Sequence, residues 1–482
     1  MSTATPSIPA FGPASLPMPA AALEVLGYLT VVGVGTLCFL LGWLSPNGAV
    51  VLTVLLLSTL IVLAWNRFDQ GRHPCFLFLC TLMFFQGGKL LTYCFGAQDS
   101  PLRVRVLTYY AFDISRSDAG IVLLSLALSA ICIYAPCRWR YHRLISSDDR
   151  HTRRYLPYLY LLFYGSLPIQ LFKNYRYYEY VQEHGGYVAI FLSHGNLASS
   201  VPFLVRIIPL ISLSTFIAIF TFEHRKKYLY TAAILYFGTA SLILLLGSRL
   251  AIFALLLTLW YVARLKSTKK PRILRLLVIA LVLMVVADVI QTVREDSTAI
   301  SDYSFLPAEF LALQGNSLDV AEVAVTQRKL FAPYATSYLW HELQNAFVAS
   351  DVRNYFRGQA LSSDVSVFLN APLFAQGHGS GASYLAEAYV IGGLAGVVLI
   401  SLMIGCLLHF LYRFSRHPLS LFIVAMILPD VLSMPRQQLL DWVSVLLRSA
   451  VSILLLLAGW QLYKLLFSIR QTGACDEVGA AT

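Results

Sequence analysis

The stretch LRLLVIALVLMVVADVIQTVREDSTAI, residues 274–300, is where a long apolar run gives way to the longest polar break in the chain. Residues 274–293 are apolar over a length that can cross a membrane as a helix, since such a helix needs about 20 residues. The polar break begins at Arg294 and continues to about residue 383, where another apolar run begins. The sequence therefore predicts a membrane-embedded chain that carries one large extramembrane element.

Apolar segments of membrane-spanning length recur on both sides of this break. Hydrophobic residues make up 57% of the chain and charged residues 13%, whereas soluble domains contain about 45–50% and about 25%. Mean hydropathy is +0.67. Because a chain in lipid must satisfy its own backbone polar groups, these segments are expected to be helices. The predicted fold class is an all-α polytopic membrane protein with about 12 transmembrane helices. They are placed at roughly 22–44, 49–65, 74–95, 118–136, 155–172, 201–222, 228–246, 249–265, 274–293, 384–411, 419–434 and 443–466.

The domain organisation follows from these segments. Residues 1–20 are rich in Pro, Ala and Ser and lack a basic start, so a disordered cytoplasmic tail is expected there and no cleaved signal. Membrane helices occupy 21–293 and 384–466, on either side of the large loop at 294–383. Residues 467–482 form a second tail.

The distribution of basic residues orients the chain. Most of the 36 Lys and Arg residues lie in short loops, such as 223–227 and 264–275, on one side of the predicted helices. The positive-inside rule makes that side cytoplasmic. Both termini are then cytoplasmic, and the large loop is periplasmic. The same rule accounts for the net charge of +11, so nucleic-acid binding is not expected.

Two segments of the large loop have the periodicity of amphipathic helices. They are Pro307–Ala324 and Ser337–Ala349, and we expect them to lie on the membrane surface over a cavity between the membrane helices. The polar residues Gln314-Gly315-Asn316-Ser317 interrupt the first segment. Arg353 and Arg357 follow at i,i+4 spacing on one helix face. This pattern favours a solvated face, and contact with lipid headgroups or glycan phosphate is the alternative.

Three further arginines are expected at the periplasmic face. Arg249 ends the hairpin tip Gly247-Ser248-Arg249, Arg294 begins the polar break, and Arg436 lies between the last two predicted helices. A guanidinium can make bidentate contacts to phosphate oxygens, and N–H groups at a helix start add to that attraction. The alternative is a structural role, as an arginine that snorkels to headgroups or pairs with a nearby acid such as Asp441.

A glycine-rich segment, Gly377-His378-Gly379-Ser380-Gly381, precedes Ser383 and the predicted helix that carries Glu387. Glycines allow the backbone to approach a ligand closely. His378 could act as a general base near neutral pH, and Glu387 could do the same or orient a sugar hydroxyl. The alternatives are a simple turn at the glycines and an acid in the first helical turn that complements the helix dipole.

No metal or cofactor site is predicted. The eight cysteines lie mostly in apolar segments without paired metal-ligand spacing, so they are interpreted as small membrane-embedded residues. No Walker motif, Rossmann glycine pattern or HExxH motif occurs. Lys89, near the outer end of the 74–95 segment, is expected to snorkel to the membrane surface.

Several motifs together resemble the Wzy family of O-antigen and exopolysaccharide polymerases. They are LGSR at 246–249, LQGNSL at 313–318, GSGASYLAEAY at 379–389 and GGLAG at 392–396. They appear in the family's order, with the large outer loop in the family's place, and the resemblance covers roughly residues 150–450. One departure is that Arg249 lies on a minimal hairpin, whereas the family's best-known arginine motifs lie in two large outer loops.

The resemblance implies a GT-C-like glycosyltransferase of the bacterial inner membrane. Such enzymes move a growing glycan from undecaprenyl pyrophosphate onto a lipid-linked repeat unit, without a nucleotide sugar and without a metal. A chain-length regulator and a flippase are the expected partners, besides membrane lipid. The predicted catalytic residues are Arg249, Arg294, His378 and Glu387. The predicted substrate-binding residues are Arg436, Gln314, Ser317, Ser383, Tyr384, Arg353 and Arg357.

Two alternatives stay open. An O-antigen ligase uses the same donor but transfers the glycan to lipid A-core. A flippase or another transporter of lipid-linked oligosaccharides would carry charges along the middle of the membrane bundle. Here such charges are few, chiefly Lys89, Asp288 and Arg448.

Overall fold

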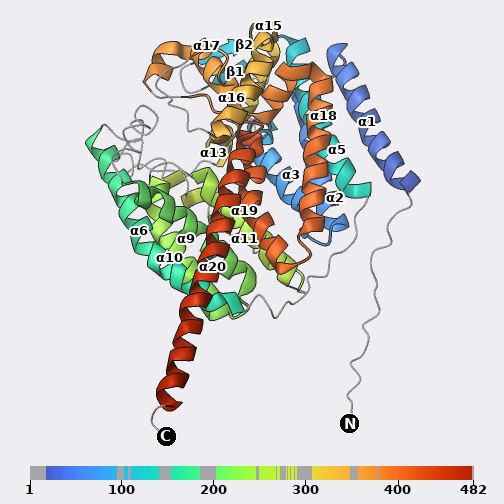
Figure 1. Cartoon of the computed structure of the whole chain (residues 1–482). Helices are drawn as coiled ribbons and strands as arrows, with labels where there is room; N and C mark the ends of the chain where they lie inside the picture. The colour runs from blue at the N-terminus through green and yellow to red at the C-terminus, as the bar shows by residue number, and fades with distance from the viewer. Residues whose placement is uncertain are drawn as a thin grey trace, which may run out of the picture.

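A computed structural model shows a bundle of helices with one small β-hairpin (Figure 1). The structure describes residues 18–94, 103–106, 110–139, 154–184, 202–245, 249–267, 269–271, 307–347, 356–376 and 379–479, with isolated positions between 278 and 289.

Six helices in the described ranges contain a stretch long and apolar enough to cross a membrane. They are α1 (Met18–Leu40), α2 (Pro46–Arg67), α5 (Arg116–Trp139), α18 (Tyr384–Phe414), α19 (Pro418–Ser433) and α20 (Asp441–Gly479). A seventh candidate is the bent pair α3 (Pro74–Phe85) and α4 (Gly87–Cys94). The prediction of a polytopic helical membrane protein is confirmed.

Four more helices overlap predicted spans, and the first of them ends at residue 183, beyond its predicted end at 172. They are α6 (Leu156–Glu183), α9 (Phe203–Phe222), α10 (Lys226–Leu245) and α11 (Arg249–Lys266), and their described residues do not meet the same test of length and hydropathy. The predicted helix at 274–293 lies largely outside the described residues, as do residues 1–17 of the predicted tail. The number of about 12 spans therefore stays a prediction.

Helix starts occur where the sequence supplies a cap and a proline. Ser45 accepts a hydrogen bond from the Gly48 N–H at 3.1 Å, and Pro46 occupies the first helical position of α2. The same arrangement begins α3, where His73 precedes Pro74. Proline suits this position because the first helical N–H groups have no partner within the helix. The residues at each break thus determine where α2 and α3 begin.

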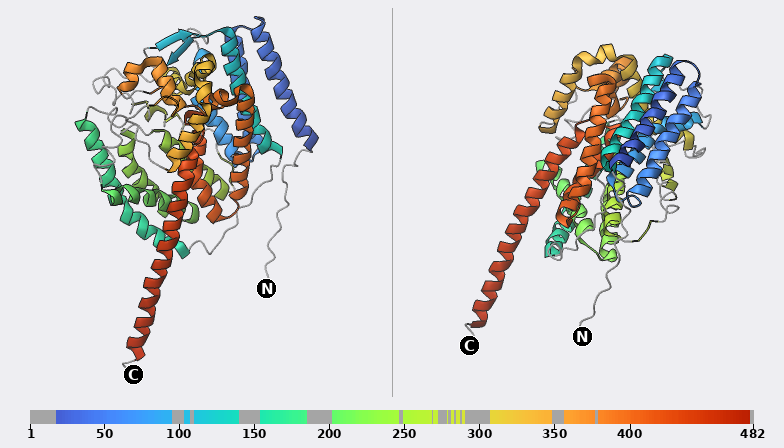
Figure 2. Two further views of the ribbon diagram at one scale, coloured as in Figure 1. Left: turned by 45° about the horizontal axis from the view of Figure 1, so that its top comes forward. Right: turned by 90° about the vertical axis from the view of Figure 1, so that its right-hand side faces the viewer.

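The helices of the large loop gather at one end of the bundle, which we call the loop end. They are α13 (Pro307–Gln314), α14 (Asn316–Thr326), α15 (Arg328–Phe331), α16 (Ala335–Phe347) and α17 (Leu361–Ala375). The hairpin of β1 (Arg103–Val106) and β2 (Tyr110–Asp113) pairs Arg103 with Asp113 in an antiparallel register. Figure 1 shows α15, α16, α17 and the hairpin at the top, and Figure 2 shows α20 extending beyond the opposite end, the tail end.

Helix α14 differs from the expectation of a helix on the membrane surface. Each residue from Ser317 to Val325 is buried, and α14 packs against α18 and α5. The physical reason is its composition, since most of these side chains are Val, Ala or Leu, and its two acids are neutralised by a lysine described below. The break at Gln314–Ser317 is confirmed, because α13 ends at Gln314 and α14 begins at Asn316.

The predicted span at 74–95 is broken. Helices α3 and α4 meet at an angle of 58°, and Gln86 lies between them. Two glycines follow. At the second, Gly88, α4 packs so closely on α13 that an added Cβ would lie 2.9 Å from the carbonyl oxygen of Leu311. Non-helical backbone within a membrane protein is tolerated where protein surrounds it. The break therefore places polar groups inside the bundle.

Candidate functional site

The start of α18 lies at the centre of a buried polar junction. Ser383 caps the helix by accepting from the Ala386 N–H. Gln86, at the break between α3 and α4, donates to the Ser383 hydroxyl and to the Pro435 carbonyl, each at 3.1 Å. Gln86 and Ser383 are 0% and 1% exposed. Three segments that are far apart in the sequence are thus held together at the loop end.

Arg436 joins this junction from the turn η3 (Met434–Arg436), between α19 and α20. Its Nη1 donates to the Gln314 side-chain oxygen at 2.5 Å, and its guanidinium lies 5.7 Å from the centre of the Phe85 ring. The side chain is half-buried. Both Arg436 and Gln314 were predicted to bind substrate, and the structure brings them into contact.

A pair of buried acids lies beside this turn. Glu387 is in the first turn of α18 and accepts from the Leu439 N–H at 2.7 Å. Glu342 of α16 accepts from the Leu440 N–H at 3.0 Å. The two acids are 3% and 4% exposed. Consecutive backbone N–H groups after Arg436 thus position both carboxyl groups.

The two carboxyl groups face each other. Oε1 of Glu387 and Oε1 of Glu342 accept from no backbone N–H among the described residues, and the two side chains form a hydrogen bond with one another. Carboxylate oxygens only accept, so this contact requires a shared proton. Burial raises the pKa of Glu342 to about 7, and Asp441 adds to the rise. A proton on this pair is therefore exchangeable near neutral pH.

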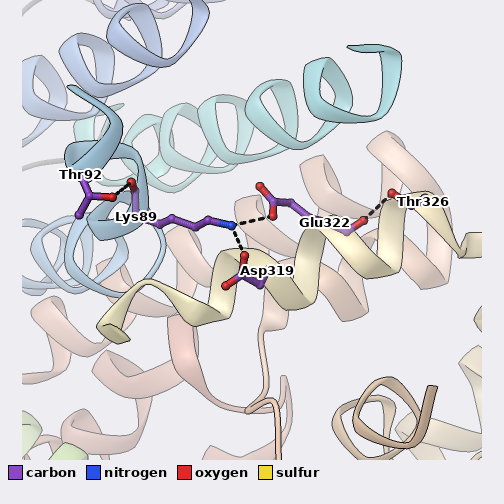
Figure 3. Close-up of polar contacts among 5 residues, drawn as sticks. All are labelled: Lys89, Thr92, Asp319, Glu322 and Thr326. Atoms are coloured by element: carbon purple, nitrogen blue, oxygen red, sulfur yellow. Dashed lines mark hydrogen bonds and ion pairs between the residues drawn. The ribbon is translucent and has the colours of Figure 1, made fainter. Parts of the chain in front are cut away.

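A second charged cluster anchors α14 to α4 (Figure 3). The Lys89 ammonium contacts Asp319 and lies 3.0 Å from Oε2 of Glu322. All three side chains are at most 5% exposed. The prediction that Lys89 snorkels to the membrane surface is therefore wrong, because two carboxyl groups inside the bundle provide its partners.

The cluster holds one cation and two acids. Burial raises the pKa of Asp319, and it raises the pKa of Glu322 to about 8, while Lys89 opposes both shifts. One carboxyl group therefore keeps a proton near neutral pH, which leaves a neutral cluster. The hydroxyl groups of Thr92 and Thr326 donate to the carbonyl oxygens of Lys89 and Glu322 at 2.6 and 2.9 Å. These hydrogen bonds lie within the helices α4 and α14, which carry the cluster.

Gly315 lets α14 approach α4 at this point. A Cβ added there would lie 2.4 Å from the backbone nitrogen of Lys89, which cannot move without shifting α4. We expect Gly315→Ala to destabilise the protein by about 1–3 kcal/mol, the usual cost of overpacking. Gly165→Ala on α6 is the matched control, since nothing lies within 4 Å of its added Cβ. Thermal unfolding of both variants in detergent checks this, and equal melting temperatures would contradict it.

The other predicted site residues have different surroundings. Tyr384 is fully buried and bonds to the Ser129 hydroxyl at 2.6 Å, in the contact between α18 and α5. Ser317 is 2% exposed within α14. Arg357 is exposed, with its guanidinium 5.2 Å from the Tyr334 ring. Arg249 is the first residue of α11. Its side chain, together with Arg294, Arg353 and His378, lies outside the described residues.

Sequence reasoning missed Gln86, Glu342 and the partners of Lys89. The succession Gln86-Gly87-Gly88-Lys89 within an apolar segment was the available signal, because polar residues next to two glycines favour a break in a membrane helix. Glu342 carried no such signal, since an acid on an amphipathic helix is usually solvated.

Comparison with known proteins adds one match. The family model described as O-antigen polysaccharide polymerase Wzy matches residues 28–467, nearly the whole chain. No curated protein and no solved structure matches the chain.

Proposed function

The chain belongs to the Wzy family of O-antigen polysaccharide polymerases, and we propose that its reaction takes place at the loop end of the bundle. The donor would be a growing glycan on undecaprenyl pyrophosphate, and the acceptor a lipid-linked repeat unit. The observation that carries the proposal is the segment from Pro435 to Leu440, in which a half-buried arginine is followed, three and four residues later, by the backbone N–H groups that hold two buried carboxyl groups.

In this proposal Arg436 stabilises the leaving group. The bond between the donor sugar and the pyrophosphate oxygen breaks, and the pyrophosphate keeps the electron pair. A guanidinium fixed before the reaction stabilises that developing charge, which is typically worth 10²–10³ in rate. Gln314 and the Phe85 ring hold Arg436 in place, and the Lys89 cluster supports the start of α14 directly after Gln314.

The carboxyl pair serves as the general base. As the acceptor hydroxyl oxygen forms its bond to the donor sugar, its proton passes to Glu387, and Glu342 shares that proton. A base is most effective when its pKa lies near the working pH. Glu342 is thus a positioning residue, which acts through Glu387.

The remaining predicted residues keep proposed roles. Arg249 and Arg294 would add positive charge around the pyrophosphate, Arg353 would contact glycan phosphate or lipid, and His378 would be a second candidate base. We also propose a GT-C-like arrangement in the bacterial inner membrane, with both termini cytoplasmic and the loop end periplasmic. Catalysis would need no metal, and a chain-length regulator and a flippase would be the partners.

Glycan length in cells that lack the gene tests the function. Complementation with the natural sequence should restore a ladder of chain lengths, and Arg436→Ala should leave mostly single repeat units at equal protein levels in the membrane. Arg413→Ala, an exposed arginine in the last turn of α18, is the matched control and should restore the ladder. Long glycans that persist on the polyprenyl carrier in the null strain, with none on the lipid core, would instead identify a ligase.

The pH dependence of the rate gives a separate prediction. Glu342 holds its proton below a pKa of about 7, so the pair can accept a proton from the acceptor hydroxyl only above that range. We expect the elongation rate to rise with pH through about 7. Glu342→Gln removes the shared proton, and the rise should move to lower pH. Rates of the purified protein in liposomes from pH 5 to 9 (a window of about two units on each side) measure both profiles, and unchanged profiles would contradict the assignment.

A further inference from the structure

A cluster of metal-binding side chains lies at the tail end of the bundle. His73 precedes α3, Cys75 is in its first turn, and Cys137 is near the end of α5. All three residues are 0% exposed. One nitrogen or sulfur atom from each lies within 4.8 Å of the others. The folding of α3 against α5 thus brings together donors that no sequence spacing indicates.

The local backbone fixes these side chains. Nδ1 of His73 accepts from the Cys75 N–H at 3.1 Å as the cap of α3. The Cys137 thiol donates to the Gly405 carbonyl oxygen at 3.3 Å, where α5 packs on α18. Gly405 has no room for a side chain, because an added Cβ would lie 2.6 Å from the Ile133 carbonyl oxygen. The donors therefore belong to the rigid packing of three helices.

We propose that His73, Cys75 and Cys137 bind a thiophilic metal ion such as Zn²⁺. Two thiolates and an imidazole suit such an ion, with Zn–S of about 2.3 Å and Zn–N of about 2.0–2.1 Å. Ligand atoms around one ion then lie roughly 3.5–4 Å apart. The observed spacing needs only a small contraction. Both thiols lose their protons on binding, so Cys137 gives up its hydrogen bond to the Gly405 carbonyl oxygen. Ligation through Nδ1 of His73 would likewise replace its hydrogen bond from the Cys75 N–H.

The surroundings enclose the ion. The His409 ring stacks on His73 at a centroid distance of 5.9 Å, and the Tyr412 ring lies 4.5 Å from it. These rings close the site to large molecules. The site is at the end of the bundle opposite to Glu387, so it takes no part in glycosyl transfer. Its effect is to fasten the start of α3 to the end of α5, independently of the proposed reaction.

Cobalt binding to the purified full-length chain in detergent tests this site. Co²⁺ alone is the probe, because thiolate ligands give a charge-transfer band in the near ultraviolet. We expect the band in the natural sequence and its loss in Cys75→Ser and in Cys137→Ser. Cys132→Ser is the matched control, since Cys132 is buried on the same helix α5 but is not part of the cluster.

Metal content gives the second readout. Protein purified from zinc-supplemented cells should hold Zn²⁺ in equimolar amount, and each of the two cluster variants should lose it while Cys132→Ser keeps it. Absence of the cobalt band and of zinc in the folded, purified natural sequence would overturn the proposal. Retention of metal in both cluster variants would also overturn it.

Discussion

Glu387→Gln is expected to lower the rate of glycan elongation by about 10²–10⁴-fold, the usual contribution of a positioned general base. The amide keeps nearly the same shape, and its oxygen can still accept from the Leu439 N–H. It cannot take a proton from an acceptor hydroxyl. The measurement is the initial rate of the purified variant in liposomes, with kcat and KM for the repeat unit determined separately. We expect kcat to fall while KM changes little.

Glu179→Gln is the matched control for this substitution. Glu179 lies on α6, its side chain is partly exposed and pairs with Arg176, and it is not a member of the carboxyl pair, so its loss should leave the rate unchanged. Melting temperatures of both variants should match that of the natural sequence. If Glu387→Gln elongates glycans at the normal rate while Arg436→Ala does not, Glu387 is a structural acid at a helix start, and the base must be sought elsewhere, first at His378.

Lys89→Met is expected to destabilise the protein by about 3–5 kcal/mol, because it removes the cation from a buried ion pair and leaves its acids without compensation. Asp319 and Glu322 are 0% and 4% exposed, so water cannot replace the ammonium. We expect a lower melting temperature and less folded protein in the membrane. Fluorescence-detected size exclusion of the solubilised protein measures both.

Restoring charge balance should reverse the defect. Lys89→Met combined with Asp319→Asn and Glu322→Gln removes the charge from all three residues, and replacing a buried ion cluster as a whole is often close to neutral for stability. Recovery of folded protein in this triple variant would show that uncompensated charge causes the loss. A triple variant as unstable as Lys89→Met would contradict that explanation and point to packing of the lysine stem.

Local patterns in the sequence were sufficient for much of the fold. Apolar runs predicted where these helices lie, and the caps and prolines at Ser45-Pro46 and His73-Pro74 account for where α2 and α3 begin, because these features act within one turn. The contact between Gln314 and Arg436 was not itself predicted, although both residues were selected as binding residues. Glu387 was likewise selected from its place after the glycine-rich segment.

What could not be predicted depends on contacts between distant segments. Lys89 looks like an interfacial lysine until α14 brings Asp319 and Glu322 to it. Glu342 becomes a partner of Glu387 only because the N–H groups of Leu439 and Leu440 hold the two acids together. In a membrane protein a buried charge is tolerated only with such a partner, so the partner has to be known before the charge can be interpreted.

Reconstitution with a defined substrate tests the central claim most directly. The purified chain in liposomes is supplied with a single lipid-linked repeat unit on undecaprenyl pyrophosphate, and the glycans are separated by length. The proposed function predicts a ladder of chain lengths with release of undecaprenyl pyrophosphate, both lost in Arg436→Ala and Glu387→Gln. A substrate that stays a single unit with the natural sequence, while the protein remains folded and lipid-embedded, would contradict the proposal that this chain alone catalyses polymerisation.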